Sequence, residues 1–520
     1  MSLSVQQQEV IARIASNWRL TPATLATKLT KGEWIAAPWL QYASSRIAYH
    51  IARGGGRLII SAPPRHGKTE LVAKWTPTWT LENFPKKNVI LTGYGADLSE
   101  QSGRWVRDTI REFGNDLGVL KARIRQDVSK VSAFLTETDG YMFSVGLGGA
   151  ITGRGAHVLL IDDYIKEIKE ALSPAHRDYI WNWFVTVAMT RLEPGATVII
   201  IATRWHSDDL IGRILKNYPG KWENICFPDR CDNPDAEIER IIGRQKGEPL
   251  FPARYDETFL QGQEDLLGSI FYNALYRQRP MDESTKFTNT EWLKRIKDPS
   301  ILADDWQWMR VWDLAATEDG GDYTCGSLCG YSKSTSNFII ANILRRQQTP
   351  GQVEESVKAV AQADGDHIKI RIEEEPGSSG KSLTNHYKTN VLPDYDVDRV
   401  PATKAKLIRA QPFLAAAEAG KVYLLDEDSA DQAYDKLGKT WHKLFAGEFE
   451  VFPGGPQDDQ VDTVSAAYTA LSGKKTLPVS WGRSKATQQK LNSRSIRQAS
   501  FVKAKQGRRS SIAWGRTIKD

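Results

Sequence analysis

Short apolar runs alternate with longer amphipathic segments between residues 57 and 205. The runs lie at 58–60, 88–92, 140–145, 158–161 and 197–202. Apolar runs of this length, separated by helical segments, are typical of buried strands in a mostly parallel sheet with helices on both faces. Before them, apolar residues from Val10 to Trp18 recur at helical spacing, which predicts a helical lead-in over residues 1–50.

A different pattern begins near residue 308. Strand-like runs lie at 308–314, 323–331, 337–344 and 367–372, and a helical segment at 351–363 precedes the last of them. This order of strand, hairpin, helix and strand predicts a second α/β domain that differs from the first. The expected parts are a helical lead-in (1–50), a first core (51–225), the end of the first domain with a connector containing a helix at 259–277 (226–300), a second core (301–475) and a tail (476–520).

The charge of the chain is concentrated at one end. The net charge is +6 over 520 residues, but residues 481–520 hold eleven Lys or Arg and a single acid, Asp520. A basic tail of this composition is expected to be flexible and suits a phosphate backbone or an acidic protein surface. The chain has four Cys, no apolar stretch of about 18 residues and no secretory leader, so we expect a protein of a reducing cytosol without membrane contact.

The first apolar run leads into the segment Ser-Ala-Pro-Pro-Arg-His-Gly-Lys-Thr at residues 61–69. This segment matches the phosphate-binding loop G-x-x-x-x-G-K-S/T except that Ala62 stands at the first Gly. Backbone N–H groups of such a loop face the phosphates, Lys68 adds a point charge and the Thr69 hydroxyl binds Mg²⁺. We therefore expect a site for ATP with Mg²⁺, whose nucleotide-binding residues are Ala62, Pro63, Pro64, Arg65, His66, Gly67, Lys68 and Thr69, with a helix that starts near Lys68.

Two later strand ends fit the same site. The run at 158–161 ends in Asp162 and Asp163, of which the first would hold Mg²⁺ and the second would polarise the attacking water. The run at 197–202 ends in Thr203, which could sense the γ-phosphate. Arg65, Arg154 and Arg204 are candidates for the charge that stabilises the phosphoryl-transfer transition state, and Arg65 is preferred because it lies inside the loop.

Three acidic groups mark the second domain. Asp313 lies inside a predicted strand, Glu373, Glu374 and Glu375 end another, and Asp458, Asp459 and Asp462 precede an apolar helical segment at 464–471. Carboxylates from separate elements can hold two divalent ions, Mg²⁺ or Mn²⁺, that activate water against a phosphodiester. Three unrelated acidic turns would give the same pattern, and Asp458 and Asp459 could instead cap the following helix.

Together these motifs resemble the large terminase subunit of tailed bacteriophages. The resemblance rests on PPRHGKT (63–69), TGRGAH (152–157), LLIDD (159–163), ATRWH (202–206), WDLA (312–315), EEPGSSGK (374–381) and DDQVD (458–462). It implies an N-terminal ATPase of the ASCE P-loop type joined to a C-terminal ribonuclease H-like α/β nuclease. By this likeness Thr203 couples hydrolysis to movement, Asp313 and Asp459 act in cleavage, and Glu375, with Glu373 as second choice, is the middle metal ligand.

The resemblance also implies a function and partners. Such proteins cut concatemeric viral DNA and pump the double-stranded DNA into a procapsid, so we expect a portal protein, a small terminase subunit and a ring of identical chains as partners. The expected location is the host cytoplasm and, transiently, the portal vertex of the procapsid, and not the mature virion. A helicase or repair-type DNA-dependent ATPase without nuclease activity and a nucleotide-switched capsid-assembly protein are the competing hypotheses.

Overall fold

The structure is a computed structural model that describes residues 17–149, 151, 153–282, 284–315, 323–374, 383–401, 406–426 and 440–473. The expected tail at 476–520 and the first 16 residues of the expected lead-in lie outside these residues. The described part of the lead-in forms two helices, α2 (Pro22–Leu29) and α3 (Pro38–Arg53). Both start with Pro in the first turn, where its missing N–H costs no hydrogen bond. Among the described helices, none is both long and apolar enough to cross a bilayer.

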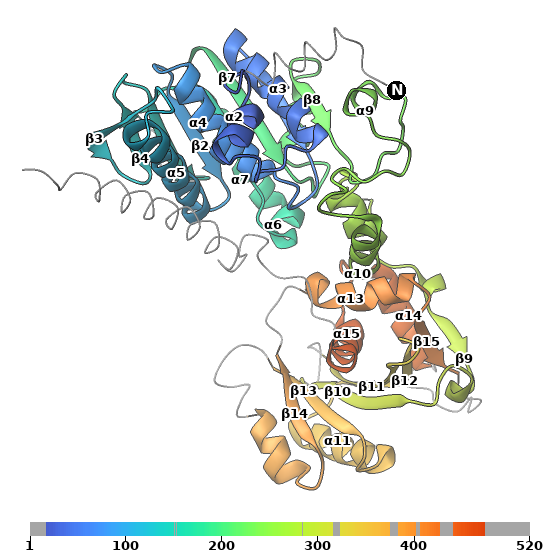
Figure 1. Ribbon diagram of the computed structural model, residues 1–520. Coiled ribbons are helices and arrows are strands. Elements are labelled where there is room, and N and C mark those ends of the chain that lie inside the picture. The colour runs from blue at the N-terminus through green and yellow to red at the C-terminus, as the bar shows by residue number, and fades with distance from the viewer. Residues whose placement is uncertain are drawn as a thin grey trace, which may run out of the picture. The chain divides into compact units, whose positions relative to one another are not determined.

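The first sheet has eight strands in the order β3-β4-β5-β2-β6-β7-β1-β8 (Figure 1). The strands are β1 (Arg57–Ser61), β2 (Val89–Gly93), β3 (Ile124–Ser129), β4 (Ala133–Thr136), β5 (Tyr141–Gly146), β6 (Ala156–Asp162), β7 (Leu192–Ala202) and β8 (Glu223–Cys226). Neighbours from β5 to β8 are parallel, and β3 and β4 extend the sheet antiparallel at one edge. The five predicted strands are confirmed as β1, β2, β5, β6 and β7. The sequence missed β3, β4 and β8, which lie at or near the edges, are short and, in β3 and β8, mostly expose their residues.

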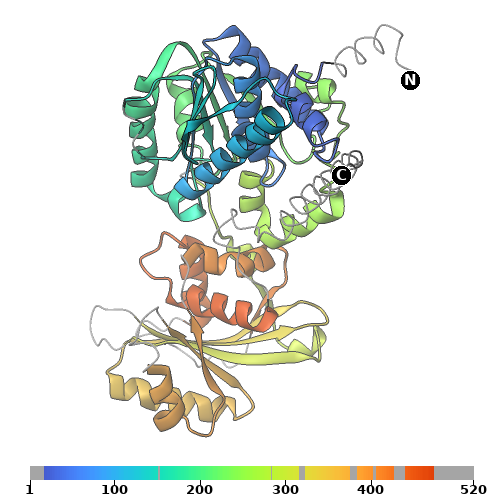
Figure 2. The same cartoon turned by 60° about the vertical axis from the view of Figure 1, so that its left-hand side comes forward.

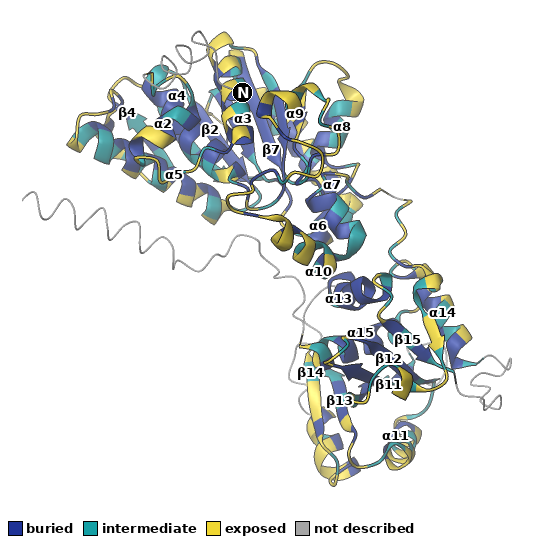
Figure 3. Cartoon of the chain, turned by 45° about the vertical axis from the view of Figure 1, so that its right-hand side comes forward, coloured by how far each residue is buried: buried dark blue, intermediate teal, exposed yellow. Residues whose placement is uncertain are grey.

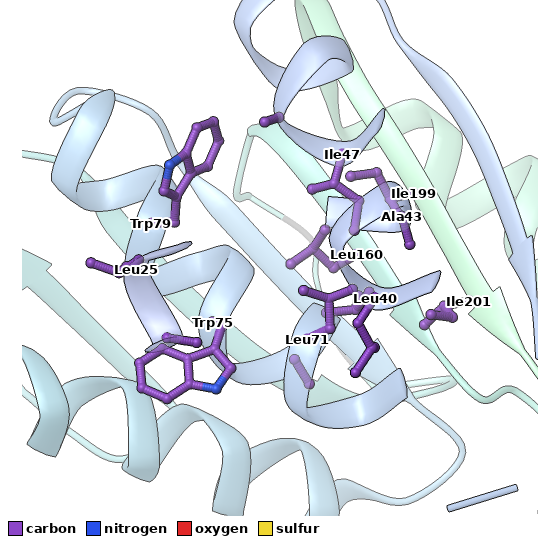
Figure 4. Packing of buried hydrophobic residues seen from close by; sticks show 14 of the residues in the cluster. Leu25, Leu40, Ala43, Ile47, Leu71, Trp75, Trp79, Leu160, Ile199 and Ile201 are labelled. Atoms are coloured by element: carbon purple, nitrogen blue, oxygen red, sulfur yellow. The ribbon is translucent and has the colours of Figure 1, made fainter. Parts of the chain in front are cut away.

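Helices cover both faces of this sheet. They are α4 (Thr76–Asn83), α5 (Ala96–Ile110), α6 (Ile168–Leu172), α7 (Pro174–Trp183), α8 (Leu210–Asn217) and α9 (Glu237–Ile242), with π-helical turns η1 (Glu70–Trp75), η2 (Arg111–Asp116) and η3 (Phe184–Ala188) and a 3-10 turn η4 (Met189–Arg191). The longer helix α10 (Glu257–Leu275) follows them in the chain. Figure 4 shows how α3, η1 and the sheet interlock: Ile47 and Leu71 meet Leu160 and Ile199 in one apolar layer, and all four are fully buried. Burial of such side chains contributes about 1.5–3 kcal/mol each, so this layer fixes the frame on which the loop after β1 stands.

The second sheet has seven strands in the order β14-β13-β10-β11-β12-β15-β9. The strands are β9 (Lys294–Ile296), β10 (Trp306–Asp313), β11 (Thr324–Ser332), β12 (Phe338–Arg346), β13 (Lys369–Glu374), β14 (Val397–Pro401) and β15 (Val422–Leu425). β10, β11 and β12 form an antiparallel meander, and the outer strands add to it in parallel. The predicted order of strand, hairpin, helix and strand is confirmed by β10, β11, β12, α11 (Pro350–Asp364) and β13.

Two helical layers sandwich this sheet (Figure 2). The layer of α11 and the π-helical turn η7 (Tyr387–Val391) covers Trp312, Ile370 and Ile372. The other layer contains α13 (Lys406–Glu418), α14 (Trp441–Val451) and α15 (Asp459–Ser472), while η5 (Thr290–Trp292) and η6 (Pro299–Ile301) are short 3-10 turns. As Figure 3 shows, the strands of both sheets are largely buried and the outer helix faces are exposed.

Candidate active sites

The loop after β1 is shaped by two left-handed residues, Arg65 with φ 61° and Gly67 with φ 100°. The helix after the loop begins at Lys68, as predicted, and continues into η1. Ala62 does not have a positive φ; it is fully buried, and its N–H donates to the Ala202 carbonyl at the end of β7 (3.3 Å). The conformation that requires glycine thus falls at position 67, which explains why the loop tolerates alanine at position 62.

Lys68 is directed into its own loop. Its Nζ donates to the carbonyls of Ala62 and Pro63 (both 2.9 Å) and to the Thr203 hydroxyl (2.5 Å). Burial lowers the pKa of Lys68, and the nearby Asp163 and Asp162 carboxylates oppose that shift. All three hydrogen bonds of this ammonium go to uncharged oxygens. An anion at the loop would therefore be a stronger hydrogen-bond acceptor for Lys68.

Asp162 and Thr69 face each other across the loop. The Thr69 hydroxyl donates to Asp162 Oδ1 (3.3 Å), at the end of β6. Burial, and then the neighbouring Asp163 carboxylate, raise the pKa of Asp162 to about 7. A half-buried carboxylate beside a hydroxyl, with no ion pair to a cation among the described residues, is a donor set that suits Mg²⁺.

Asp163 is fixed by the end of β7. It has a positive φ (43°), its Oδ1 accepts from the Thr203 N–H (3.0 Å) and its carbonyl accepts from the Tyr94 N–H (2.8 Å). Thr203 therefore contacts Lys68 through its hydroxyl and Asp163 through its backbone. The structure brings Lys68, Thr69, Asp162, Asp163 and Thr203 together, from β1, β6 and β7.

The three candidate arginines differ in their surroundings. Arg204 is buried, and its Nε donates to Asp209 Oδ2 (2.7 Å). The guanidinium of Arg154 lies 4.0 Å from the centre of the Phe143 ring. Arg65 is exposed, and its carbonyl accepts from the Tyr255 hydroxyl (3.2 Å), which sets its backbone. Arg65 and Arg154 are both exposed and Arg204 is buried, and of the two exposed arginines Arg65 lies inside the loop itself.

His66 is a buried residue of the loop that packs against Tyr255. Its ring is 1% exposed, its Nδ1 lies 2.8 Å from the Pro64 carbonyl and its ring centre lies 4.7 Å from that of Tyr255. Burial lowers the pKa of His66 to about 3, with the Pro64 hydrogen bond opposing and Lys68 adding to the shift. A neutral ring at this position supports the loop structurally. The sequence did not reveal the partner Tyr255, which lies far along the chain and carries no local signal.

The second candidate site is defined by which residues share a face of the second sheet. Asp313 pairs with Cys325 across an antiparallel ladder, so their side chains lie on the same face, and Cys325 Sγ lies 3.5 Å from the Thr463 hydroxyl of α15. On β13, Ile372 lies on the opposite face with α11, so Glu373 lies on the α15 face and Glu374 on the α11 face. Glu375 lies outside the described residues.

The third acidic group lies on α15 itself. The helix begins at Asp459, earlier than the predicted 464, so Asp459 and Asp462 both belong to its first turn. The Asp458 side chain does not cap the helix. The cap comes from Glu448 of α14, whose Oε1 accepts from the N–H groups of Gln460 (2.7 Å) and Val461 (2.9 Å). The alternative that Asp458 and Asp459 serve as caps is therefore wrong for Asp458, which leaves its carboxylate available to the acidic cluster.

We call Asp313, Glu373, Asp458, Asp459 and Asp462 the acidic cluster. Two cations from α13 neutralise part of it. Arg409 donates to Glu373 and to Asp462 Oδ2 (2.9 Å), and Lys406 donates to Asp458 Oδ1 (2.6 Å). The sequence did not predict the role of these two residues. A Lys and an Arg three positions apart on a helix form no motif that indicates pairing with carboxylates of other elements.

Two carboxyl groups of the acidic cluster have raised pKa values. Burial, then Glu373 and Asp459, raise the pKa of Asp313 to about 7. Burial also raises the pKa of Asp462 to about 7, against the opposing charge of Arg409. Both shifts have the sign expected where more carboxylates than cations are gathered.

The acidic cluster suits divalent cations in its ligand type. Within the described ranges, no three acidic, His or Cys side chains are already arranged as a metal site. However, Glu373 Oε2 and Asp462 Oδ1 are buried carboxylate oxygens without a hydrogen-bond partner. Uncompensated buried carboxylate oxygens are costly and favour a hard cation as their partner. Arg409 contacts the other carboxylate oxygen of each of these two residues, Glu373 Oε1 and Asp462 Oδ2.

Two family models match consecutive parts of the chain. The family model described as terminase large subunit, T4likevirus-type, N-terminal, matches residues 59–291, and the model described as terminase RNaseH-like domain matches residues 310–471. No curated protein matches the sequence.

Solved structures are similar along most of the chain at low identity. The large terminase from a thermophilic bacteriophage, in complex with ATP-gamma-S, is 11% identical, covers 81% of this chain and 94% of its own, and has a TM-score of 0.44. The HK97 bacteriophage large terminase is 12% identical, with 81% and 91% covered and a TM-score of 0.31. The nuclease domain of the large terminase from bacteriophage SPP1 with bound Mn is 12% identical, with 35% and 98% covered and a TM-score of 0.24.

Proposed function

The chain belongs to the family of large terminase subunits, and from this premise we propose that it drives double-stranded DNA into a viral procapsid by ATP hydrolysis and cuts the concatemeric DNA. The family assigns it an ATPase part and a ribonuclease H-like nuclease part, and hence a role in DNA packaging and cleavage in general. In this proposal the ATPase core is 51–225, its end and the connector are 226–300, the nuclease is 301–475, and 1–50 and 476–520 are accessory segments.

In the proposed ATPase site, residues 62–69 bind the phosphates. Lys68 would exchange its contacts with Ala62, Pro63 and Thr203 for phosphate oxygens, because an anion is a stronger acceptor than a carbonyl. Thr69 and Asp162 would hold Mg²⁺, which neutralises charge that develops on the phosphates. Once Lys68 no longer contacts the Thr203 hydroxyl, Thr203 would respond to the presence of the phosphate. Its N–H would still orient Asp163 toward the attacking water.

In the proposed nuclease site, the acidic cluster holds two divalent cations, Mg²⁺ or Mn²⁺. Asp313, Glu373 and Asp459 or Asp462 supply carboxylates from three elements, and Glu375 remains a candidate beside Glu373. Such a pair of ions activates water and stabilises the leaving oxygen of a phosphodiester. Arg409 and Lys406 compensate the acidic charge until the ions and the DNA arrive.

One observation carries the proposal: a single chain combines a phosphate loop whose Thr69 meets Asp162 with an acidic cluster on the second sheet that has buried, unpartnered carboxylate oxygens. The test measures ATPase activity and Mn²⁺-dependent cleavage of plasmid DNA in the full chain. Lys68→Ala should lower the ATPase rate by about 10³-fold and leave cleavage intact. Asp313→Ala should lower cleavage by at least about 10³-fold and leave ATPase intact.

The two variants control for each other, since each should retain the activity that the other loses. Cleavage by Asp313→Ala at the wild-type rate would refute the nuclease assignment. Strand separation on forked duplexes without any cleavage in Mn²⁺ would instead support the helicase alternative. Glu374→Gln is the matched control for the acidic cluster, because Glu374 lies on the other face of the sheet and pairs at 3.6 Å with Arg399.

Family membership also leads us to propose partners and a location. The chain would act as a ring of identical subunits on the portal protein of the procapsid, with a small terminase subunit that delivers the DNA. It would work in the host cytoplasm and, during packaging, at the portal vertex, and would be absent from the mature virion. The basic residues 481–520 would contact the portal or the DNA, and their deletion should abolish packaging while basal ATPase persists.

A further inference from the structure

Arg345 lies beside the acidic cluster on the same face of the second sheet. It stands near the end of β12 and pairs with Cys325 of β11, which in turn pairs with Asp313 of β10. Directly opposed residues of antiparallel strands point to the same face, so Arg345 shares the α15 face with Asp313. Two strand spacings separate their backbones, which is about 10 Å.

The Arg345 side chain is held in place without a carboxylate partner. Its guanidinium lies 3.5 Å from the centre of the Tyr323 ring and donates to Gln457, the residue just before Asp458. Its Nε is buried without a hydrogen-bond partner. Burial raises the pKa of Glu448, and the charge of Arg345 lowers it to a smaller extent. Both carboxylate oxygens of Glu448, however, accept hydrogen bonds from Gln460 or the α15 backbone. Among the described residues, Arg345 makes no ion pair.

Arg345 thus contrasts with the two cations of α13. Arg409 and Lys406 point into the acidic cluster and pair with its carboxylates, so they neutralise the protein itself. Arg345 is stacked and hydrogen-bonded by uncharged groups, which orient it while leaving its charge available. A guanidinium prepared in this way suits a phosphate group, which it can bind through two parallel hydrogen bonds.

We propose that Arg345 binds a backbone phosphate of the DNA strand that enters the acidic cluster, held for this role by Tyr323 and Gln457. The inference rests on the proposed nuclease function and extends it by naming a substrate contact. The acidic cluster repels a phosphate backbone, so a cation that its carboxylates do not neutralise must offset that repulsion at the edge of the site. Phosphate contacts of this kind set the register of the nucleic acid and do not read its sequence.

The test compares cleavage kinetics of Arg345→Ala, Arg345→Gln and Arg345→Lys with wild type in Mn²⁺, over a range of duplex DNA and NaCl concentrations. For Arg345→Ala the KM for DNA should rise about tenfold near 0.1 M salt, while kcat changes less than twofold. The slope of log(kcat/KM) against log salt should become shallower by about 0.9, because one phosphate contact is lost. Arg345→Lys should keep the slope and recover part of the KM, since it keeps the charge without the planar fork.

Arg346→Ala is the matched control, because the neighbouring residue on β12 is an exposed arginine that alternates to the other face. It should leave KM, kcat and the salt slope unchanged. If Arg345→Ala destabilises the fold, Arg345→Gln retains an amide donor while it removes the charge and the guanidinium stack on Tyr323, and the same KM rise is expected from it. An unchanged KM and salt slope in a folded Arg345→Gln variant would overturn the inference, whereas wild-type protein without Mn²⁺-dependent cleavage would overturn the nuclease function itself.

Discussion

The phosphate loop and the acidic cluster differ in the sign of their main charge and in how that charge is compensated. In the loop, one cation, Lys68, is surrounded by carbonyl and hydroxyl oxygens of its own segment and of Thr203. In the acidic cluster, five carboxylates gather around two cations from α13. The first arrangement is ready for an anion, because no carboxylate has to give up Lys68. In the second, Arg409 and Lys406 already pair with Glu373, Asp458 and Asp462, so metal ions would compete with these internal cations.

The two sites also differ in how their parts come together. Residues 62–69 are contiguous, and their geometry follows from two left-handed residues between a strand and a helix. The acidic cluster joins β10, β13 and α15 and depends on the strand register and on a helix cap from α14. We therefore expect substitutions within residues 62–69 to change the activity of the loop directly. The activity of the acidic cluster should also respond to substitutions outside it that change the strand register or the helix cap.

The largest effect is expected from Arg65. If this exposed loop arginine stabilises the transition state of phosphoryl transfer, Arg65→Ala should lower the ATPase kcat by at least about 10³-fold and leave cleavage unchanged. Arg65→Gly should lose the same activity but be at least as stable as Arg65→Ala, because φ is 61° at this position. Steady-state ATPase assays and thermal unfolding measure the two effects.

Arg154→Ala is the comparison for that prediction, since the Arg154 side chain stacks on Phe143. It should retain ATPase activity within a few-fold of wild type. The reverse pattern, with activity lost in Arg154→Ala and kept in Arg65→Ala, would move the catalytic charge away from the loop.

The contrast also explains what the sequence could predict. The strand before the loop, the helix start at Lys68 and the parallel core strands follow from short-range patterns, and all were expected. Asp313 stood out because a carboxylate inside an apolar strand demands a partner. Arg409, Glu448 and Tyr255 were not predictable, because what makes each important is a residue from another element, and that pairing appears only once the chain is folded.

A smaller effect, about 3 kcal/mol of unfolding free energy, is expected from Glu448. Glu448→Ala leaves the buried N–H groups of Gln460 and Val461 without their acceptor, so α15 should lose stability at its first turn. Asp459 and Asp462 belong to that turn, so cleavage should fall while ATPase activity stays unchanged. Urea unfolding and the two activity assays check this prediction. Glu448→Gln keeps one acceptor and should lose less, and equal stability of Glu448→Ala and wild type would show that α15 needs no cap from α14.

The smallest effect is expected from pH at His66, and it tests whether the loop is as locally determined as the comparison suggests. The folded pKa of His66 is about 3, below the unfolded value of about 6.5. The unfolded chain therefore binds a proton that the folded chain does not, so the stabilising contribution is complete above pH 6.5 and declines as the pH falls toward 3. Between pH 7 and pH 5 this linkage should remove about 2 kcal/mol of unfolding free energy. His66→Phe keeps a ring against Tyr255 but cannot titrate, so it should be less stable than wild type at pH 7, where it lacks the Pro64 hydrogen bond, yet lose less stability on acidification. Urea unfolding of both proteins at the two pH values gives the difference, and equal losses would mean that His66 becomes exposed to water in the folded chain before pH 5.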